Sequence, residues 1–203
     1  MKKNSILIST LHDQDIPAVV ALHEKTIRSI GSAIGKPYLT TLYGLVSDHP
    51  HTGCGMVAKD KGTGVVVGSI LAVTDPEAYS MMRIVRSNPR MLFALGKGIL
   101  MGRIGIGDFF HHLVFLQKSK HMYQRPFLAI HALCVDTSLQ RMGIGTMLVL
   151  AVKKEARKRM IPHLYVDTLK TNTTARRFYG SSGFTACLQA GDSILFSWFA
   201  GKG

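Results

Sequence analysis

The sequence predicts an α+β fold, in which short buried strands alternate with amphipathic helices. Three observations indicate this class: a hairpin pattern in the first half, a strand–glycine–helix segment in the second, and two apolar runs near the C-terminus that suit an antiparallel pair. With 203 residues, 46% of them hydrophobic and 18% charged, the chain is long enough for one full core and short for two. We therefore expect a single domain over residues 1–203.

The first half alternates strand and helix patterns. Residues 5–30, "SILISTLHDQDIPAVVALHEKTIRSI", predict a strand, a polar break and a helix, with Asp13 or Asp15 as the N-cap. Apolar residues at helical spacing predict a second helix over 36–47. The period then changes, and "GCGMVAKDKGTGVVVGSILAVTD" (53–75) predicts a hairpin with strands around 55–59 and 65–73.

The second half continues the pattern beyond residue 125. "PFLAIHALCV" (126–135) predicts a buried strand, and 146–160 a helix whose last turns are crowded with Lys and Arg before Pro162. "HLYVDTL" (163–169) predicts a strand, and "NTTARRFYGSSG" (172–183) a helix closed by Gly183. "FTACLQ" and "SILFSWF" then predict the terminal antiparallel pair.

Residues 76–125 form a segment of different composition, which we interpret as an insertion with helical tendency. It carries eight Lys and Arg residues against two acidic ones, Glu77 and Asp108, interleaved with Met, Leu and Phe. One expectation is that these apolar side chains are buried in the core or in a homodimer interface. The other is that basic, apolar helices lie on an anionic membrane surface or dock a partner.

Charge and cysteine content narrow the function classes. A net charge of +13 favours an anionic partner, which could be nucleic acid, anionic lipid or an acidic small molecule. No zinc-finger, RRM or KH signature is present and the aromatic residues sit in apolar runs, so we do not expect nucleic-acid binding. Three scattered cysteines without metal-ligand spacing predict free thiols and no metal site.

The termini and hydropathy indicate no targeting or spanning segment. The apolar run after the basic start "MKK" is too short for a signal peptide, and no stretch of 18 apolar residues exists. We therefore expect a cytoplasmic protein without a transmembrane helix.

The segment "VDTSLQRMGIGTML" (135–148) is the first candidate for a binding site. A strand ends at Val135, and Gly143 and Gly145 stand where a helix begins. Helix N-termini leave backbone N–H groups unsatisfied, and glycines let a phosphate approach them, which together make a pyrophosphate cradle. Arg141 adds a mobile positive charge. The alternative is a tight strand-to-helix turn with no ligand.

A similar segment, "GRIGIG" (102–107), lacks this setting. It follows the glycine-broken run "LGKGILMG", and Asp108 would place a like charge beside any phosphate. We expect it to be a loop or a helix break. The chain also lacks GxxxxGK[ST] and any GxGxxG after an N-terminal strand, so the common nucleotide motifs are absent.

The surroundings of the first glycine pair resemble a known superfamily. Gln140 to Gly145 is similar to the Q/R-x-x-G-x-G/A segment of the GNAT superfamily of acetyl-CoA-dependent N-acetyltransferases. A second signature of that superfamily resembles "NTTARRFYGSSGF", through Asn172, Ala175, Phe178, Tyr179, Gly183 and Phe184. The resemblance implies the GNAT fold: a central mixed, mostly antiparallel sheet flanked by helices, here with the helical insertion between strands three and four.

The resemblance also implies roles for individual residues. Backbone groups of the strand ending at Val135 would hold the pantetheine arm and polarise the thioester carbonyl, and residues 141–146 would hold the pyrophosphate. Asn172 would hydrogen-bond the arm. The implied binding residues are Leu133, Cys134, Val135, Gln140, Arg141, Met142, Gly143, Ile144, Gly145, Thr146 and Asn172. Tyr179 would donate a hydrogen bond to the departing thiolate; full proton transfer is uphill, because a phenol has a pKa of about 10 and a thiol one of about 8.5.

Transfer to an amine also requires a general base, because an ammonium group has no lone pair. We expect His131, on the strand that leads to the acyl donor, to serve; Asp167, His111, His112 and Glu24 are alternatives. A covalent route through Cys134 would need an activating base beside it, and neither neighbour on the strand is one. Direct transfer is therefore expected.

The predicted function is transfer of the acetyl group of acetyl-CoA directly to a primary amine of a small-molecule acceptor. The surplus of Arg and Lys in the insertion favours an acceptor with phosphate or carboxylate, such as a nucleotide-linked amino sugar. The alternatives are a protein or peptide N-acetyltransferase, and a peripheral membrane or partner-binding module of the same fold. The oligomeric state is open, a homodimer included.

Overall fold

The computed structural model describes residues 5–27, 30–86, 88–102 and 119–201, and its centre is a seven-stranded sheet. The strand order is β1-β2-β3-β4-β5-β7-β6. Among the described strands, only β4 and β5 are parallel neighbours; the other pairs are antiparallel, which confirms the expected mixed sheet. The strands are β1 (Ile6–Thr10), β2 (Gly53–Asp60), β3 (Val66–Val73), β4 (Phe127–Val135), β5 (His163–Leu169), β6 (Thr185–Ala190) and β7 (Ser193–Phe199).

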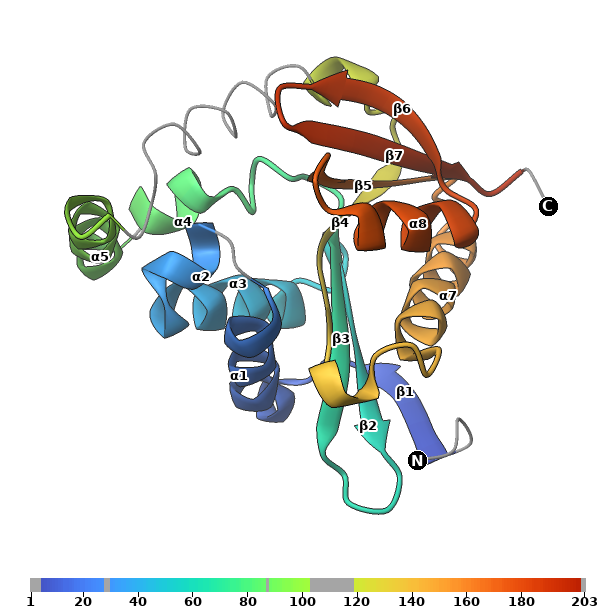
Figure 1. Cartoon of the computed structure of the whole chain (residues 1–203), viewed down its shortest axis with the longest axis horizontal. Coiled ribbons are helices and arrows are strands. Elements are labelled where there is room, and N and C mark those ends of the chain that lie inside the picture. Colours follow the sequence, from blue (N-terminus) through green and yellow to red (C-terminus); the bar gives the residue numbers. More distant parts are fainter. Residues whose placement is uncertain (1–4, 28–29, 87, 103–118, 202–203) are drawn as a thin grey trace.

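Helices cover both faces of the sheet (Figure 1). α1 (Ile16–Thr26), α2 (Ile30–Ile34) and α3 (Lys36–Asp48) lie on one side, and α7 (Ile144–Lys158) and α8 (Thr173–Ser181) on the other. Between β3 and β4 the chain adds α4 (Met81–Arg86) and α5 (Pro89–Leu100). The described part of the chain also has three 3-10 turns: η2 (Asp13–Asp15), η3 (Lys120–Met122) and η4 (Thr137–Leu139).

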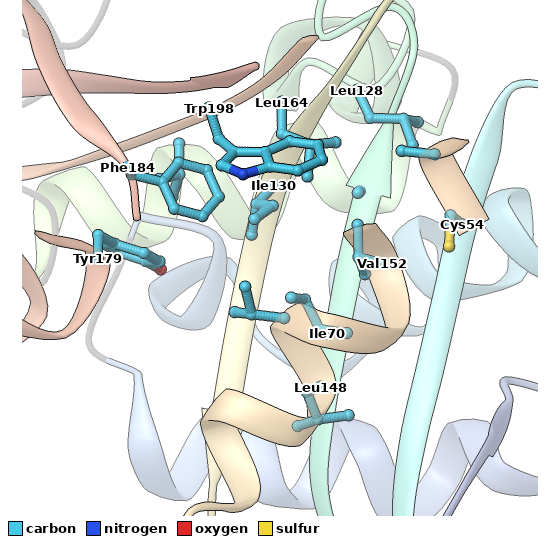
Figure 2. Packing of buried hydrophobic residues seen from close by; sticks show 14 of the residues in the cluster. Cys54, Ile70, Leu128, Ile130, Leu148, Val152, Leu164, Tyr179, Phe184 and Trp198 are labelled. Carbon is cyan, nitrogen blue, oxygen red and sulfur yellow. The ribbon is translucent and has the colours of Figure 1, made fainter. Parts of the chain in front are cut away.

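The two helical layers bury separate apolar clusters. The first joins α7 and α8 to the sheet; Figure 2 shows Leu148 of α7 at one end of it and Tyr179, Phe184 and Trp198 side by side at the other. The second cluster joins α1, α3, α4 and α5 to the opposite face. Residues of both α7 and α8 pack in the first cluster, which places the N-termini of these two helices against the same face of the sheet.

Polar contacts explain two local features of the N-terminal half. Asp60 fixes the β2–β3 turn by accepting from the N–H groups of Gly62 and Thr63, each at 2.9 Å. Asp15 stands at the N-cap of α1, as one of the two expected residues, but its carboxylate does not cap α1; it accepts instead from the N–H of His12, before η2, at 3.3 Å. It is buried and paired with Lys59 at 2.6 Å, so its charge ties α1 to β2.

α7 begins and ends two residues earlier than the expected 146–160. Gly143 adopts the left-handed conformation (φ 83°), which starts the helix at Ile144. At the other end Met160 is left-handed (φ 56°), and the N–H of Ile161 donates to the carbonyl of Ala156 at 2.8 Å, closing the last turn before Pro162.

The basic residues of α7 have structural partners. Lys153 is buried, donates to the carbonyl of Ser182, and lies 4.7 Å from the ring centroid of Trp198. Arg159 donates to the carbonyls of Pro50 and Gly53 at 2.7 and 2.9 Å. Part of the positive charge therefore stabilises contacts between elements and is not available to a ligand.

The insertion is helical where it is described, as expected. α4 and α5 bury five apolar side chains in the second cluster: Met81, Ile84, Val85, Met91 and Leu95. Others remain exposed, above all Phe93 and Leu100. The second glycine pair, Gly105 and Gly107, and the candidate bases His111 and His112 lie outside the described residues. No described helix has both the length and the hydropathy needed to cross a bilayer.

Candidate functional site

The site lies where β4 and β5 diverge. The two strands pair only over Phe127–Ile130 and His163–Val166; afterwards β4 follows β3 as far as Val135, and β5 follows β7 as far as Leu169. A cavity of about 330 Å³ occupies this divergence. Its lining comes from the end of α1, from β4, β5 and α8: Thr26, Ile27, Ile130, His131, Ala132, Leu133, Val166, Asp167, Thr168, Asn172, Ala175 and Tyr179.

A β-bulge at His131 shapes the β4 side of this cavity. Consecutive residues of β3, Leu71 and Ala72, pair with Ala132 and Ile130, so His131 is the extra residue. Before the bulge Ile130 packs in the cluster under α7 and α8, and after it Leu133 and Val135 do, while Ala132 packs in the opposite cluster. The bulge therefore changes which positions of β4 face the α7 and α8 side, and it bends the strand at the cavity.

The loop between β4 and α7 presents backbone donors. Arg141 (φ 64°) and Gly143 (φ 83°) are both left-handed, and α7 starts directly afterwards without a side-chain cap on Gly143. The N–H of Met147 donates to the carbonyl of Gly143. The earlier N–H groups, those of Ile144, Gly145 and Thr146, precede the first carbonyl within helical reach. They form a small set of donors at the positive end of the helix dipole, which suits an anionic group.

Glycine is needed at two positions of this loop for different structural reasons. Gly143 supplies the left-handed conformation. A Cβ on Gly145 would lie 3.3 Å from the ring of Phe178, so Gly145 allows α8 to pack closely on α7. We expect both glycines to let a phosphate approach the backbone; in the structure Gly145 has a packing role as well.

Two side chains hold the loop in place. Asp136 accepts from the N–H of Ser138 at 2.9 Å and from its hydroxyl at 2.7 Å, and it pairs with Lys25 of α1 at 3.0 Å. These contacts, the Ser138 hydroxyl first, lower the pKa of Asp136 to about 2, so this carboxylate is ionised and compensated. Gln140 donates to the carbonyl of Val135 at 3.4 Å. Gln140, predicted as a binding residue, therefore has its side-chain amide directed to the loop itself.

Asn172 and Tyr179 enter the cavity from α8. Asn172 is the N-cap of the helix: its side-chain oxygen accepts from the N–H of Ala175 at 3.0 Å, which leaves its NH₂ group as the part that can bind a ligand. Tyr179 is buried against Phe178 and Phe184, with ring centroids 5.3 and 5.8 Å away. Among the described residues, none hydrogen-bonds its hydroxyl group.

Electrostatics favour a protonated Tyr179. Burial raises the pKa of its hydroxyl well above the ordinary value of about 10, and the nearby Asp167 and Cys134 raise it further. The group is therefore a neutral hydrogen-bond donor at physiological pH. Its charge state favours the predicted role of donor over that of proton source.

The remaining candidates fall into two groups. His131 and Asp167, from the two diverging strands, line the cavity and are exposed to solvent. Cys134 is buried and absent from the cavity lining, and burial raises the pKa of its thiol. Glu24 does not line the cavity either. In the described ranges, no three His, Cys, Asp or Glu side chains gather as metal ligands would.

Some of the cavity could not be found in the sequence. Thr26 and Ile27, at the end of α1, line the cavity. Lys25 holds the loop between β4 and α7 through its ion pair with Asp136. These contacts join residues more than 100 positions apart, and no local pattern marks them. The sequence predicted the helix, but not that it ends at this cavity.

The fold and the site together define a class. A mixed sheet with one diverging parallel pair, a cavity in that divergence, and a glycine-bearing loop before a helix is the arrangement of acyl-CoA N-acyltransferases. The family model described as "Acetyltransferase (GNAT) family" matches residues 19–184. The chain belongs to this family, whose members are acetyl-CoA-dependent acetyltransferases.

Solved structures agree on the fold. The PaiA N-acetyltransferase of Thermoplasma acidophilum, solved with coenzyme A, has a TM-score of 0.62 at 12% identity, over 96% of this chain and 99% of that one. The Escherichia coli ribosomal-protein-S18-alanine N-acetyltransferase has a TM-score of 0.57 at 14% identity, covering 96% and 94%. Arabidopsis thaliana NAA60, with a bisubstrate analogue, has 0.62 at 14%, covering 96% and 97%. No protein of curated function is detectably similar in sequence.

Proposed function

We propose that this chain transfers the acetyl group of acetyl-CoA directly to a primary amine of a small-molecule acceptor. The observation that carries the proposal is the cavity between the diverging strands β4 and β5. His131 and Tyr179 both line this cavity, and β4 leads from His131 to the loop between β4 and α7. The acyl donor supplies the activated acetyl group. The chain's own residues bind it, orient it and handle the protons.

The residues present fit an acyl-CoA on three counts. The N–H groups of Ile144, Gly145 and Thr146 would bind the pyrophosphate, with Arg141 and Met142 in the same loop. The edge of β4 from Leu133 through Cys134 to Val135, which β5 does not pair, would offer backbone groups to the pantetheine arm. The free NH₂ of Asn172 would bind the same arm from the opposite wall.

Tyr179 would act on the sulfur. Its hydroxyl, kept protonated by burial, would donate a hydrogen bond as the sulfur gains negative charge, which lowers the barrier to acyl transfer. A donor that is buried and preorganised is more effective than water in this role. The buried, protonated Cys134 supports direct transfer without a covalent enzyme species.

His131 would remove the proton from the acceptor amine, directly or through water. It lines the cavity at the bulge of β4, across the divergence from Asp167. Asp167 is the alternative base, because it lines the same cavity.

Replacing His131 by Gln distinguishes the two bases. We expect kcat to fall about 100-fold near neutral pH, which is a typical contribution of a general base. The pH range in which the rate rises should also shift upward, to the pH at which the acceptor amine loses its proton without a base. Steady-state kinetics over pH measure both. Asp167→Asn is the matched comparison: if it removes the pH-dependent rise and His131→Gln does not, the base is Asp167.

The acceptor would be an anionic amine, such as an amino sugar that carries phosphate or carboxylate. Two exposed basic residues of α4, Arg83 and Arg86, support this, because α4 contacts α3, and α3 packs on α1, whose end lines the cavity. No acidic residue lies between Glu77 and Asp108. A cationic acceptor such as a polyamine would find no carboxylate on α4.

An acceptor panel tests the proposal. Purified protein with acetyl-CoA is assayed for free thiol against anionic amino sugars, polyamines, and peptides with free N-termini. We expect the highest kcat/KM with the anionic amino sugars. A clear preference for peptides would instead indicate a protein N-acetyltransferase, and a preference for polyamines would contradict the charge argument.

A further inference from the structure

α5 has apolar side chains on two opposite faces. On the inner face Met91 and Leu95 are buried, 3% and 8% exposed, where the helix contacts α2 and α4. On the outer face Phe93 is 75% and Leu100 89% exposed. These two residues are seven positions apart, two helical turns, so they share a face, and Leu92, 45% exposed, lies on the flank between this face and the inner one. We call Leu92, Phe93 and Leu100 the outer strip.

Basic side chains accompany the outer strip. Arg90 and Lys97, also seven positions apart and both exposed, run along one side of it, and the exposed Arg83 and Arg86 belong to the neighbouring α4. No acidic residue occurs between Glu77 and Asp108. The outer strip is therefore apolar, and the charged side chains of α4 and α5 are all basic.

This combination fits one kind of surface. Single exposed apolar side chains are common on soluble proteins, and Met160 of this chain is 86% exposed, but contiguous ones mark an interaction site. A helix with an apolar face and Lys or Arg beside it lies in the interface of an anionic bilayer, where apolar groups enter the acyl region and cations meet headgroup phosphates. Nucleic acid would match the charge but not the apolar centre of the strip.

We propose that α5 docks this protein on an anionic membrane surface. Leu92, Phe93 and Leu100 would enter the bilayer interface, and Arg90 and Lys97 would contact the lipid phosphates. The position of α5 suits this contact, because it lies at an outer edge of the molecule (Figure 1). Its inner face stays packed on α2 and α4, so docking requires no unfolding.

The test is co-sedimentation of the full chain with vesicles of phosphatidylcholine alone and of phosphatidylcholine with phosphatidylserine. We expect binding to the anionic vesicles, weakened by added salt, and little to the neutral ones. Two double variants, Phe93→Glu with Leu100→Glu and Arg90→Glu with Lys97→Glu, should each weaken binding about tenfold or more. The control is Val65→Glu with Leu150→Glu, which charges two apolar side chains that are 58% and 57% exposed elsewhere.

Each result that contradicts the proposal has a different interpretation. No binding of the unaltered chain to anionic vesicles overturns the proposal, and so does equal loss in the control. A fall in melting temperature with Phe93→Glu and Leu100→Glu, without vesicle binding to lose, would mean that the strip is covered within the chain. Dissociation of a dimer by the same variant would assign the strip to a second copy. The acetyl-CoA-induced melting shift, measured on every variant, reports separately on the proposed enzymatic site.

Discussion

Replacing Gly143 by Glu should abolish acetyl-CoA binding. Gly143 is left-handed (φ 83°) directly before the N–H groups of Ile144, Gly145 and Thr146. A Glu side chain there adds a negative charge to the proposed pyrophosphate position and blocks the approach to these donors. We expect the affinity for CoA, measured by isothermal titration calorimetry, to fall at least about 100-fold, which corresponds to about 3 kcal/mol.

The matched control for this variant is Gly64→Glu. Gly64 is also left-handed (φ 72°), stands in the β2–β3 turn, and has open space where a Cβ would be. Both variants therefore carry the same new charge and a similar strain, about 1–2 kcal/mol for an L-residue in this conformation. Gly64→Glu should bind CoA normally. Equal CoA affinities in the two variants would contradict the proposal that the loop between β4 and α7 binds the pyrophosphate.

Replacing Tyr179 by Phe should lower kcat about 100-fold and leave CoA affinity unchanged. The hydroxyl is the only group removed, and one preorganised donor to a developing negative charge contributes this much. Because burial raises the pKa of Tyr179 well above 10, the hydroxyl stays protonated below that pH. The unaltered enzyme should accordingly show no loss of rate from ionisation of Tyr179 up to about pH 10, as a pH–rate profile would measure.

Tyr165→Phe is the comparison for Tyr179→Phe. Tyr165 is equally buried but belongs to a separate cluster with Phe127 and Leu195, and its hydroxyl accepts from the N–H of Gln124 at 3.1 Å. This variant loses a hydrogen bond in the core and should keep its rate. If Tyr179→Phe also keeps its rate within about twofold, the tyrosine serves only to pack α8.

The features predicted from the sequence are those with a local cause. Strand and helix periods placed β5 and β7 at the bounds found, 163–169 and 193–199, and α7 within two residues. The glycine at position 143 marked the start of a helix because a left-handed residue is needed there. Each of these signals lies within one element or at its end.

The geometry of the cavity depended on tertiary contacts that leave no local pattern. The bulge at His131 arises from the pairing of β4 with β3, and the divergence of β4 from β5 arises because each strand follows a different neighbour beyond Ile130. The Lys25–Asp136 pair joins positions far apart in the chain. Asn172 was assigned to a ligand, and its oxygen also caps α8, a local role that its position before a helix could have revealed.

The insertion also combines features that were predicted from the sequence with features that depend on tertiary contacts. Its helical tendency and mixed composition were visible in the sequence, and α4 and α5 confirm the helices. Which apolar side chains face inward could not be predicted, because α5 carries them on both faces. Packing on α2 and α4 selects Met91 and Leu95, and leaves Phe93 and Leu100 outside.

The most direct test of the acetyl-CoA site is the melting temperature measured in parallel with acetyl-CoA, CoA, ATP and NADH. A ligand at about 100 times its dissociation constant adds about 2.7 kcal/mol to the free energy of unfolding, enough to raise the melting temperature by several degrees. We expect a rise with acetyl-CoA and CoA and none with ATP or NADH; the rise should be lost in Gly143→Glu and kept in Gly64→Glu. No rise with either CoA species, in a protein that melts cooperatively, would contradict the proposed acetyl-CoA site.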